Sequence, residues 1–382
     1  MRPVVIAAGC LAAALALPAT AQIAVSANDH KARLVNGVNQ VPPNPTPDTV
    51  TVIDLKTNPP TIIAELNAPT SVVGPPLSVA LTPDASLALV TSATKLAPGD
   101  PTKTVPDNRM SVIDLTQQPP KVINVLEAGM GAAGVAINRA GNLALVADRN
   151  AGTVSVFTIS GKTVAPAGRV DLGGGPNSGP SAIAITPDGK TALVTRDGDH
   201  KISVLAIDGT SVTYTKRDIN AGLRPYGIDI CAPGNIAVVA NIGIGQGDAD
   251  TISVIDLTLN PPRVVETLTV GQTPEGIRCS PDGAFVAVVI HDGSNKAANS
   301  PFYNPNGRLI VFQVNGRRLE RFAQAPIGSW SQGIAFGGGQ VLVQNMVQQQ
   351  IQVFRLDKSG LFDTGYKLQM KGGPAGIAFS NP

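Results

Sequence analysis

The sequence predicts an all-β protein, a seven-bladed β-propeller with four antiparallel strands in each blade. Three observations predict this fold. A strand–turn–strand unit recurs along the chain, no stretch shows helical periodicity, and the two ends of the chain carry complementary parts of one further unit. Units of four strands that repeat every roughly 45–55 residues are typical of β-propellers.

Residues 180–208 contain the first three strands of one predicted blade. Two apolar runs, 182–186 and 191–195, flank the sequence Thr186-Pro187-Asp188-Gly189. This sequence predicts a tight turn, because proline fixes φ, aspartate bonds to its own backbone and glycine accepts positive φ. After a polar tip at 196–200, apolar residues alternate over 201–207, as in a half-buried strand. Two apolar runs joined by such a turn are typical of a β-hairpin.

The same parts recur in order through the rest of the chain. The first strand and its turn recur at 77–86, 134–142, 227–235, 276–284, 333–340 and 376–382. The third strand recurs at 50–55, 110–115, 153–159, 251–257, 308–314 and 350–356, and a fourth apolar run follows it, as at 121–128 and 263–270. The chain starts on a second strand at 23–29 and stops after a first strand, so we expect residues 376–379 and 23–68 to close one blade. Such closure leaves no free sheet edge.

Residues 1–21 are predicted to be a signal peptide. Arg2 supplies the positive end, residues 4–17 form the apolar core, and Ala19-Thr20-Ala21 is a small-residue cleavage site. A lipoprotein site at Cys10 is the alternative, which the alanines around it disfavour. The apolar run is too short for a spanning helix. We therefore expect residues 22–382 to form a single propeller domain without a membrane span, exported to the periplasm or secreted.

Composition and motifs exclude several classes of function. The chain has 29 Lys and Arg and 27 Asp and Glu residues, and removal of Arg2 leaves a net charge of +1. No basic run stands out, so binding to nucleic acid lacks its electrostatic footprint. The chain has no Cys-x-x-Cys motif and no Cys/His cluster, so neither covalent haem nor structural zinc is indicated. We expect no cofactor, no metal and a monomer.

Two cysteines follow the predicted signal peptide, and each ends the innermost strand of one of two neighbouring blades. Cys231 lies four residues after Gly227, and Cys279 lies three residues after Gly276. Because side chains alternate between the faces of a strand, these offsets indicate opposite faces. Two small buried side chains are therefore the favoured interpretation, and a disulfide between the blades is the alternative.

Long loops between second and third strands are predicted to gather on one face of the propeller. They occupy 28–48, 94–108, 242–250 and 291–307, whereas the other three such loops are short. A rim built up over the central funnel is an ordinary place for a ligand. Tolerated insertion at the surface is the alternative.

Polar residues at second-strand ends and just before first strands form a candidate ligand-binding rim. The candidates are Arg224, Tyr226, Glu275, Trp330, Gln332, Arg149, Arg196, His291 and Asp292. Such a rim fits an anionic or sugar-like small molecule, with Arg224 as the planar partner of the anion. The alternative is that these groups only cap the loops. His30 and His200 lie in loops of the same kind but on other blades, so the three histidines are not expected to form a metal site.

Asp229 and Arg278 occupy the same position, two residues after the glycine of the first strand, on adjacent blades. Most other blades have alanine there. A buried charge needs a partner. We expect these two residues to neutralise each other near the channel, in a structural role.

The runs "LVTSA", "LVTRD", "VVANIG", "TISVIDL" and "PDG" resemble the repeats of YVTN-type β-propellers of the lactonase-like seven-bladed superfamily. The resemblance covers essentially the whole chain after residue 21 and implies an exported propeller. Lactonases of this superfamily carry Arg-Pro-His before a first strand and Asn-Glu after a second strand. This chain has Arg224-Pro225-Tyr226 and Asn241-Ile242 at those places. These departures weaken the implication of lactone hydrolysis, and fold does not fix function.

Three hypotheses about function follow. The first is a binding or interaction scaffold without chemistry of its own, which holds a periplasmic protein or a small molecule on the face with the long loops. The second is a lactonase-like hydrolase or lyase that acts on a small molecule in the central funnel, with Arg224, Glu275 and His291 in polar roles. The third is an accessory subunit of a periplasmic redox system.

Overall fold

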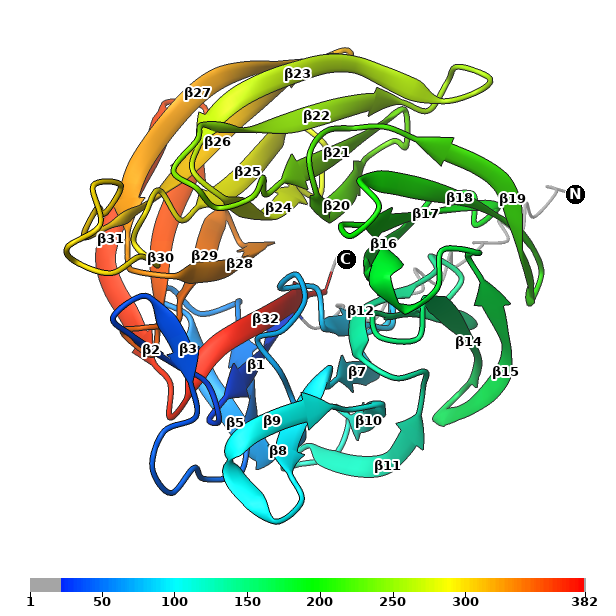
Figure 1. The fold of residues 1–382 in the computed structure, drawn as a ribbon, viewed down its shortest axis with the longest axis horizontal. Coiled ribbons are helices and arrows are strands. Elements are labelled where there is room, and N and C mark those ends of the chain that lie inside the picture. The colour runs from blue at the N-terminus through cyan, green and yellow to red at the C-terminus, as the bar shows by residue number, and fades with distance from the viewer. Residues whose placement is uncertain (1–21, 381–382) are drawn as a thin grey trace, which may run out of the picture.

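The computed structural model describes residues 22–380. In this part of the chain, seven four-stranded antiparallel sheets surround a central axis (Figure 1). The seven-bladed propeller is thereby confirmed. The predicted signal peptide, residues 1–21, lies outside the described residues. Between residues 22 and 380, no helix is long and apolar enough to cross a membrane.

The first three blades follow one another in sequence. Blade one contains β6 (Val79–Leu81), β7 (Leu87–Thr91), β10 (Arg109–Asp114) and β11 (Lys121–Glu127). Blade two contains β12 (Ala132–Ile137), β13 (Leu143–Asp148), β14 (Thr153–Ser160) and β15 (Thr163–Asp171). Blade three contains β16 (Pro180–Ile185), β17 (Thr191–Arg196), β18 (Lys201–Asp208) and β19 (Ser211–Ile219), and a short 3₁₀ helix, Pro176–Ser178, precedes it.

The next three blades have the same order. Blade four contains β20 (Pro225–Cys231), β21 (Ile236–Asn241), β22 (Asp250–Asp256) and β23 (Arg263–Gly271). Blade five contains β24 (Pro274–Cys279), β25 (Phe285–Ile290), β26 (Gly307–Asn315) and β27 (Arg318–Ile327). Blade six contains β28 (Ser331–Gly337), β29 (Gln340–Asn345), β30 (Gln350–Asp357) and β31 (Gly360–Gln369).

Blade seven joins the two ends of the described chain. Its strands are β32 (Gly373–Phe379), β1 (Ile23–Asp29), β4 (Thr49–Asp54) and β5 (Thr61–Asn67), in that order from the axis outward. The pairing of β32 with β1 places Ser26 opposite Ile377 and Ala24 opposite Phe379. The expected closure is confirmed, and it leaves no open edge between the first and last blades.

The hydrophobic core lies between neighbouring blades, where facing sheets bury their apolar side chains. The innermost strands approach one another so closely that glycine is needed in them. A Cβ atom on Gly276 would overlap the carbonyl oxygen of Gln332 in the next blade, and one on Gly227 would overlap that of Glu275. This packing explains why glycine recurs at the same position of the first strand.

The cysteine prediction was wrong, because Cys231 and Cys279 form a disulfide with their Cα atoms 5.2 Å apart. Adjacent blades face each other with opposite sides of their sheets. A side chain at an even offset from the first-strand glycine of blade four therefore meets a side chain at an odd offset in blade five. The offsets of Cys231 and Cys279 are four and three, so the two side chains can meet. Both sulfur atoms belong to the apolar cluster between these two blades. The prediction compared the two offsets as if both cysteines faced the same side of one strand, whereas the disulfide joins two different sheets.

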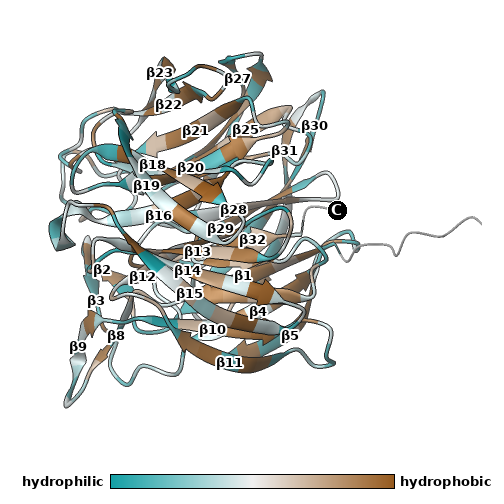
Figure 2. Cartoon of the chain, turned by 90° about the vertical axis from the view of Figure 1, so that its right-hand side faces the viewer, coloured by the Kyte–Doolittle hydropathy of each residue, from teal (hydrophilic) through white to brown (hydrophobic). Residues whose placement is uncertain are grey.

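Two of the long loops contain hairpins, β2 (Arg33–Val35) with β3 (Val38–Gln40) and β8 (Thr94–Ala97) with β9 (Asp100–Pro106). Both hairpins project from the same side of the ring, at the left in Figure 2. We call this side the loop-rich face. The β2–β3 hairpin reaches past blade six to the long loop of blade five, since a Cβ on Gly37 would lie 2.5 Å from the amide nitrogen of Ala297.

Candidate functional site

The innermost strands of blades three to six carry polar residues around the axis at the loop-rich face. Four innermost strands, β16, β20, β24 and β28, carry a polar residue at the same position, which lies two residues before continuous pairing with the second strand begins. These residues are Ser181, Tyr226, Glu275 and Gln332. All four side chains are buried. The other three blades have Ala375, Leu77 and Ala133 there. Four neighbouring blades therefore present polar residues to this ring and three present apolar ones.

Asp197, just after β17, is the centre of the first polar cluster. Its carboxylate accepts hydrogen bonds from Arg149 and Arg224, with Nη2–Oδ2 distances of 2.9 and 2.8 Å, and from Ser181. Arg149 comes from the end of β13 and Arg224 from the loop before β20, so three blades meet at one carboxylate. The guanidinium of Arg149 also lies over the ring of Tyr226, 5.8 Å from its centroid.

The electrostatics of this cluster favour an ionised carboxylate. Burial opposes the charge of Asp197, but the hydrogen bonds and charge of Arg149, with Ser181 and Arg224, outweigh it and lower the pKa of Asp197. Burial opposes the charge of Arg149, but Tyr226 and then the pairing with Asp197 outweigh it and raise the pKa of Arg149. Burial first, and then the neighbouring carboxylates of Glu275 and Asp197, raise the pKa of Tyr226, so its phenol stays protonated.

Glu275 and His291 form a second polar cluster beside the first. Their Oε2 and Nε2 atoms are 2.7 Å apart, and Nε2 also lies 2.9 Å from the carbonyl oxygen of Ser331. Both neighbours of Nε2 are acceptors, so this nitrogen carries the proton. Nδ1 of His291 is buried without a hydrogen-bond partner. His291 is only 2% exposed, so it is a core residue of the face rather than an exposed loop residue.

Trp330 and Gln332 continue the site onto blade six. Trp330 has a left-handed backbone (φ 49°), and its carbonyl accepts a hydrogen bond of 3.2 Å from the Gln332 amide. Oε1 of Gln332 is buried without a partner. The indole packs against a small apolar cluster that includes Val72 and Met346. Trp330 is therefore held in place by packing as well as by the backbone.

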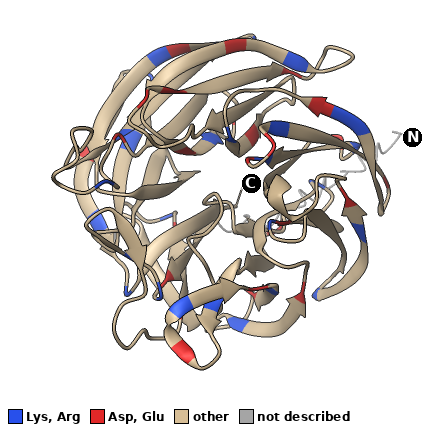
Figure 3. Cartoon of the chain, in the orientation of Figure 1, with Lys and Arg blue, Asp and Glu red and all other residues tan. Residues whose placement is uncertain are grey.

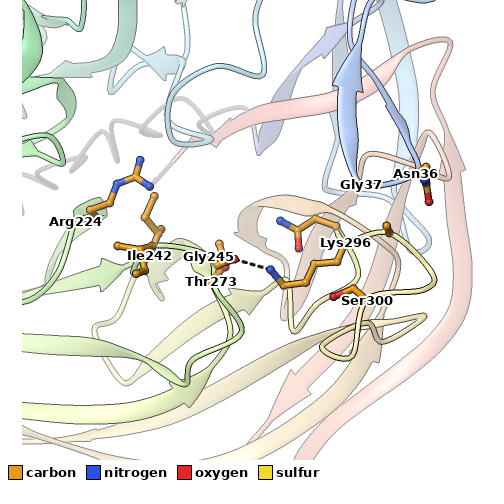
Figure 4. A pocket seen from close by; sticks show the side chains of 11 residues that line it. Asn36, Gly37, Arg224, Ile242, Gly245, Thr273, Lys296 and Ser300 are labelled. Atoms are coloured by element: carbon orange, nitrogen blue, oxygen red, sulfur yellow. Dashed lines mark hydrogen bonds between the residues drawn. The ribbon is translucent and has the colours of Figure 1, made fainter.

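A cavity of about 520 Å³ lies over blades four and five, next to these clusters. Arg224 and Ile242 line one end of it and Asn36 and Gly37 the other, with Lys296 between them (Figure 4). The ammonium of Lys296 donates to the carbonyl of Gly245, at 2.7 Å. Two cationic side chains thus line an open cavity to which three long loops contribute.

Two residues of the predicted rim do not reach this site. Arg196 is buried and bonds to the carbonyl of Leu172, which follows blade two, and to Ser203 and Asp199. These contacts, rather than the cluster around Asp197, hold its guanidinium. Asp292 has a left-handed backbone (φ 52°), and its carboxylate pairs with Arg308 at 2.9 Å.

The three histidines have separate surroundings. His30 contacts the hydroxyls of Thr46 and Thr49, and Nδ1 of His200 accepts the amide of Arg224 at 3.2 Å. Within residues 22–380, no group of three or more His, Cys, Asp or Glu side chains is arranged to hold a metal ion.

Sequence reasoning missed the contribution of Lys296 and the central position of Asp197. Lys296 lies in the middle of a long loop, where no strand pattern fixes its direction. Asp197 stands at a second-strand end, but only the approach of Arg149 and Arg224 from two other blades makes it a shared acceptor. The sequence offers one signal: an acidic residue follows the end of a second strand, while an arginine stands at a similar place in another repeat.

Exposed apolar side chains concentrate on the loop-rich face. Of the fifteen large apolar side chains that are exposed in residues 22–380, nine lie in loops at this face: Val35, Val38, Val73, Met130, Leu223, Ile244, Phe302, Tyr303 and Val347. The remaining six lie on the outermost strands of four blades. Lys, Arg, Asp and Glu are interspersed around the ring without a block of one sign (Figure 3).

No protein-family model and no curated protein matches the chain. Several solved structures share its backbone. The periplasmic gluconolactonase of Pseudomonas aeruginosa is 17% identical, with a TM-score of 0.65 over 94% of this chain and 99% of that chain. A functionally unknown protein from Desulfotomaculum acetoxidans is 18% identical, with a TM-score of 0.68 over 94% and 99% of the two chains. Hydrazine synthase of Kuenenia stuttgartiensis is 18% identical, with a TM-score of 0.63 over 83% and 92%. These likenesses show that the chain shares the propeller fold of these proteins.

Proposed function

We propose that this protein is a binding propeller that holds a partner protein on its loop-rich face and has no chemistry of its own. The observation that carries the proposal is the gathering of nine exposed large apolar side chains in the loops of this face. Exposed apolar groups that cluster on one side mark interaction surfaces, and aromatic residues such as Phe302 and Tyr303 are enriched in them.

The polar centre of the face supports binding rather than turnover. Asp197 is occupied by two arginines and a serine, and Glu275 is paired with a buried histidine. These groups are held by one another in the folded protein. Arg224, whose side chain is 35% exposed, and Lys296 remain at the edge of the cavity as partners for an acidic group on the bound protein.

The test compares two double variants that remove the same kind of side chain from different places. L223S/I244S changes the loop-rich face, where Leu223 and Ile244 are 44% and 53% exposed and Gly243 bonds to the Leu223 carbonyl. I63S/V125S is the matched control on outer strands, at 55% and 45% exposure. The immobilised wild-type protein and both variants are incubated with periplasmic extract, and the retained proteins are quantified.

We expect a protein that the wild type and the control retain equally and that L223S/I244S binds at least tenfold more weakly, because interface residues of this kind contribute about 1–2 kcal/mol each. Equal retention by all three proteins would place any binding elsewhere and refute the proposal.

A second candidate is hydrolysis of a sugar lactone, which the pair of Glu275 and His291 next to Arg224 favours. In this reaction water adds to the lactone carbonyl and the ring C–O bond breaks, giving a hydroxy acid. Glu275, paired with His291, would take a proton from the attacking water and return it to the ring oxygen that leaves, and Arg224 would stabilise the developing oxyanion. Gluconolactone is the first substrate to test, since a gluconolactonase shares the fold at 17% identity.

The hydrolase candidate predicts that the wild type releases acid from gluconolactone faster than buffer does, and that E275Q and R224Q each lose at least a hundredfold in rate. A wild-type rate equal to that of buffer would exclude this substrate.

We further infer that the protein is a monomer exported to the periplasm or secreted, as the sequence predicts. Its role as an accessory subunit of a redox system stays a prediction, and hydrazine synthase shares only the fold.

A further inference from the structure

The central channel opens at the face opposite the loop-rich one. A cavity of about 580 Å³ extends along the axis from Leu77 to the turns that join first and second strands, at Pro83, Pro187 and Pro281. This volume falls within the range of pockets that hold small molecules. The cavity shares no lining residue with the one at the loop-rich face.

Most of the residues that line the channel are apolar. Ala80, Ala136, Ala184 and Ala378 line the channel at equivalent positions of four blades, and Leu81, Ile137, Ile185, Ile230 and Phe379 surround its wider end. Blades four and five have Asp229 and Arg278 at the position of the alanines. One acid and one base therefore lie side by side on the channel wall, while Arg139 and the polar residues Thr82, Asn138, Thr186 and Ser280 line the channel at the turns between first and second strands.

The expected pairing of Asp229 with Arg278 is a loose ion pair without a hydrogen bond between the two side chains. Nη1 of Arg278 and Oδ1 of Asp229 are 4.0 Å apart, longer than the 2.7–2.9 Å typical of a charged hydrogen bond. Nη2 of Arg278 crosses to the carbonyl of Ile377 in blade seven, at 3.3 Å. The Asp229 oxygens accept the amides of Ile230 and Cys279, each at 2.9 Å.

Both side chains are in reach of the cavity, with 18% of Arg278 and 23% of Asp229 exposed. Asp229 retains free lone pairs beyond the two amides, and Arg278 retains guanidinium hydrogens beyond its one bond. Burial acts against both charges: it raises the pKa of Asp229 and lowers the pKa of Arg278. Each group would therefore gain from a further partner of opposite charge.

We propose that this channel binds a small zwitterion with an apolar body, of the class of apolar α-amino acids. The carboxylate pairs with Arg278, the ammonium pairs with Asp229, and the side chain lies against the alanines and the aliphatic residues of the wider end. A simple anion is repelled by Asp229 and a simple cation by Arg278, because the two charges are adjacent. A ligand that carries both charges avoids either repulsion.

The experiment measures binding of three related compounds by isothermal titration calorimetry. L-Phenylalanine carries both charges, 3-phenylpropanoate lacks the ammonium and 2-phenylethylamine lacks the carboxylate. We expect phenylalanine to bind and each analogue to bind at least tenfold more weakly. Absence of phenylalanine binding, or equal binding of 3-phenylpropanoate, would overturn the proposal.

Two variants locate the site and separate ligand contact from folding. In D229N the preference for phenylalanine over 3-phenylpropanoate should disappear, a change that loss of stability alone does not produce. A184L keeps both charges and fills the channel from a neighbouring blade, so phenylalanine should bind at least tenfold more weakly. Wild-type affinity in A184L would overturn the proposal.

L223S/I244S, on the other face, should bind phenylalanine like the wild type, so this inference and the proposed function can fail independently. A loss of phenylalanine affinity in this variant would place the ligand outside the channel and overturn the proposal.

Discussion

Removal of the disulfide between Cys231 and Cys279 should lower the free energy of unfolding by about 4 kcal/mol. The bridge joins residues 48 positions apart in sequence and thereby closes a loop that contains β21, β22 and β23 of blade four and β24 of blade five. A crosslink over a loop of this length removes conformational entropy from the unfolded chain, which corresponds to about 4 kcal/mol at 25 °C. Native contacts change little when alanine replaces the two buried cysteines.

The assay is urea unfolding of the C231A/C279A protein and of the wild type, followed by the fluorescence of Trp330, the single tryptophan of the sequence. The single variant C231A is the control for the bridge itself. It leaves one thiol unpaired, so it should lose nearly as much stability as the double variant.

A loss below about 1 kcal/mol in both variants would refute the reasoning, because the entropy of a loop this long would then play no part in stability. If the unfolded wild type showed two reactive thiols without a reducing agent, the disulfide would not be formed, and the prediction would fail for that reason.

Three further predictions concern single residues. Burial raises the pKa of Asp148 to about 6, above that of the unfolded chain, so the folded state binds the extra proton and stability should rise as the pH falls from 7 to 5, by about 1.3 kcal/mol. Urea unfolding at both pH values should show that D148N lacks this gain, and an equal gain in D148N would assign it elsewhere. D197A should destabilise the protein by about 2–3 kcal/mol, since it leaves two partly buried arginines without their carboxylate, whereas a loss under 0.5 kcal/mol would show that solvent replaces it. G276A should cost about 2–3 kcal/mol or more in thermal unfolding, because its Cβ would overlap the backbone of Gln332. The comparison is G209A, where φ is +58° and a Cβ meets no atom within 4 Å, so that it carries the strain of a left-handed alanine but no overlap.

The repeat pattern was sufficient to predict the fold. Strand, turn and glycine positions repeat with the blade, and each is a local consequence of sequence: period-two alternation, Pro-Asp-Gly turns, and glycine where inner strands crowd. For that reason the predicted first three strands of blade three agree with β16, β17 and β18 within two residues at each end.

The sequence predicted where residues of the candidate site lie in the ring, but not which of them contact each other. Arg224, Tyr226 and Glu275 could be placed near the axis, because their strand position sets their depth in the ring. That Asp197 is shared by Arg149 and Arg224, and that His291 is buried against Glu275, depends on which blades approach each other and at what distance. Side-chain direction in a long loop, as for Lys296, is likewise not fixed by local pattern.

The sequence by itself therefore determined the number of blades, the order of strands and the ring closure, since each depends on neighbours along the chain. Only the tertiary structure decided which side chains meet across blades. The disulfide shows the reason: Cys231 and Cys279 lie on unlike faces of their own strands, yet they meet because adjoining sheets present opposite faces to each other.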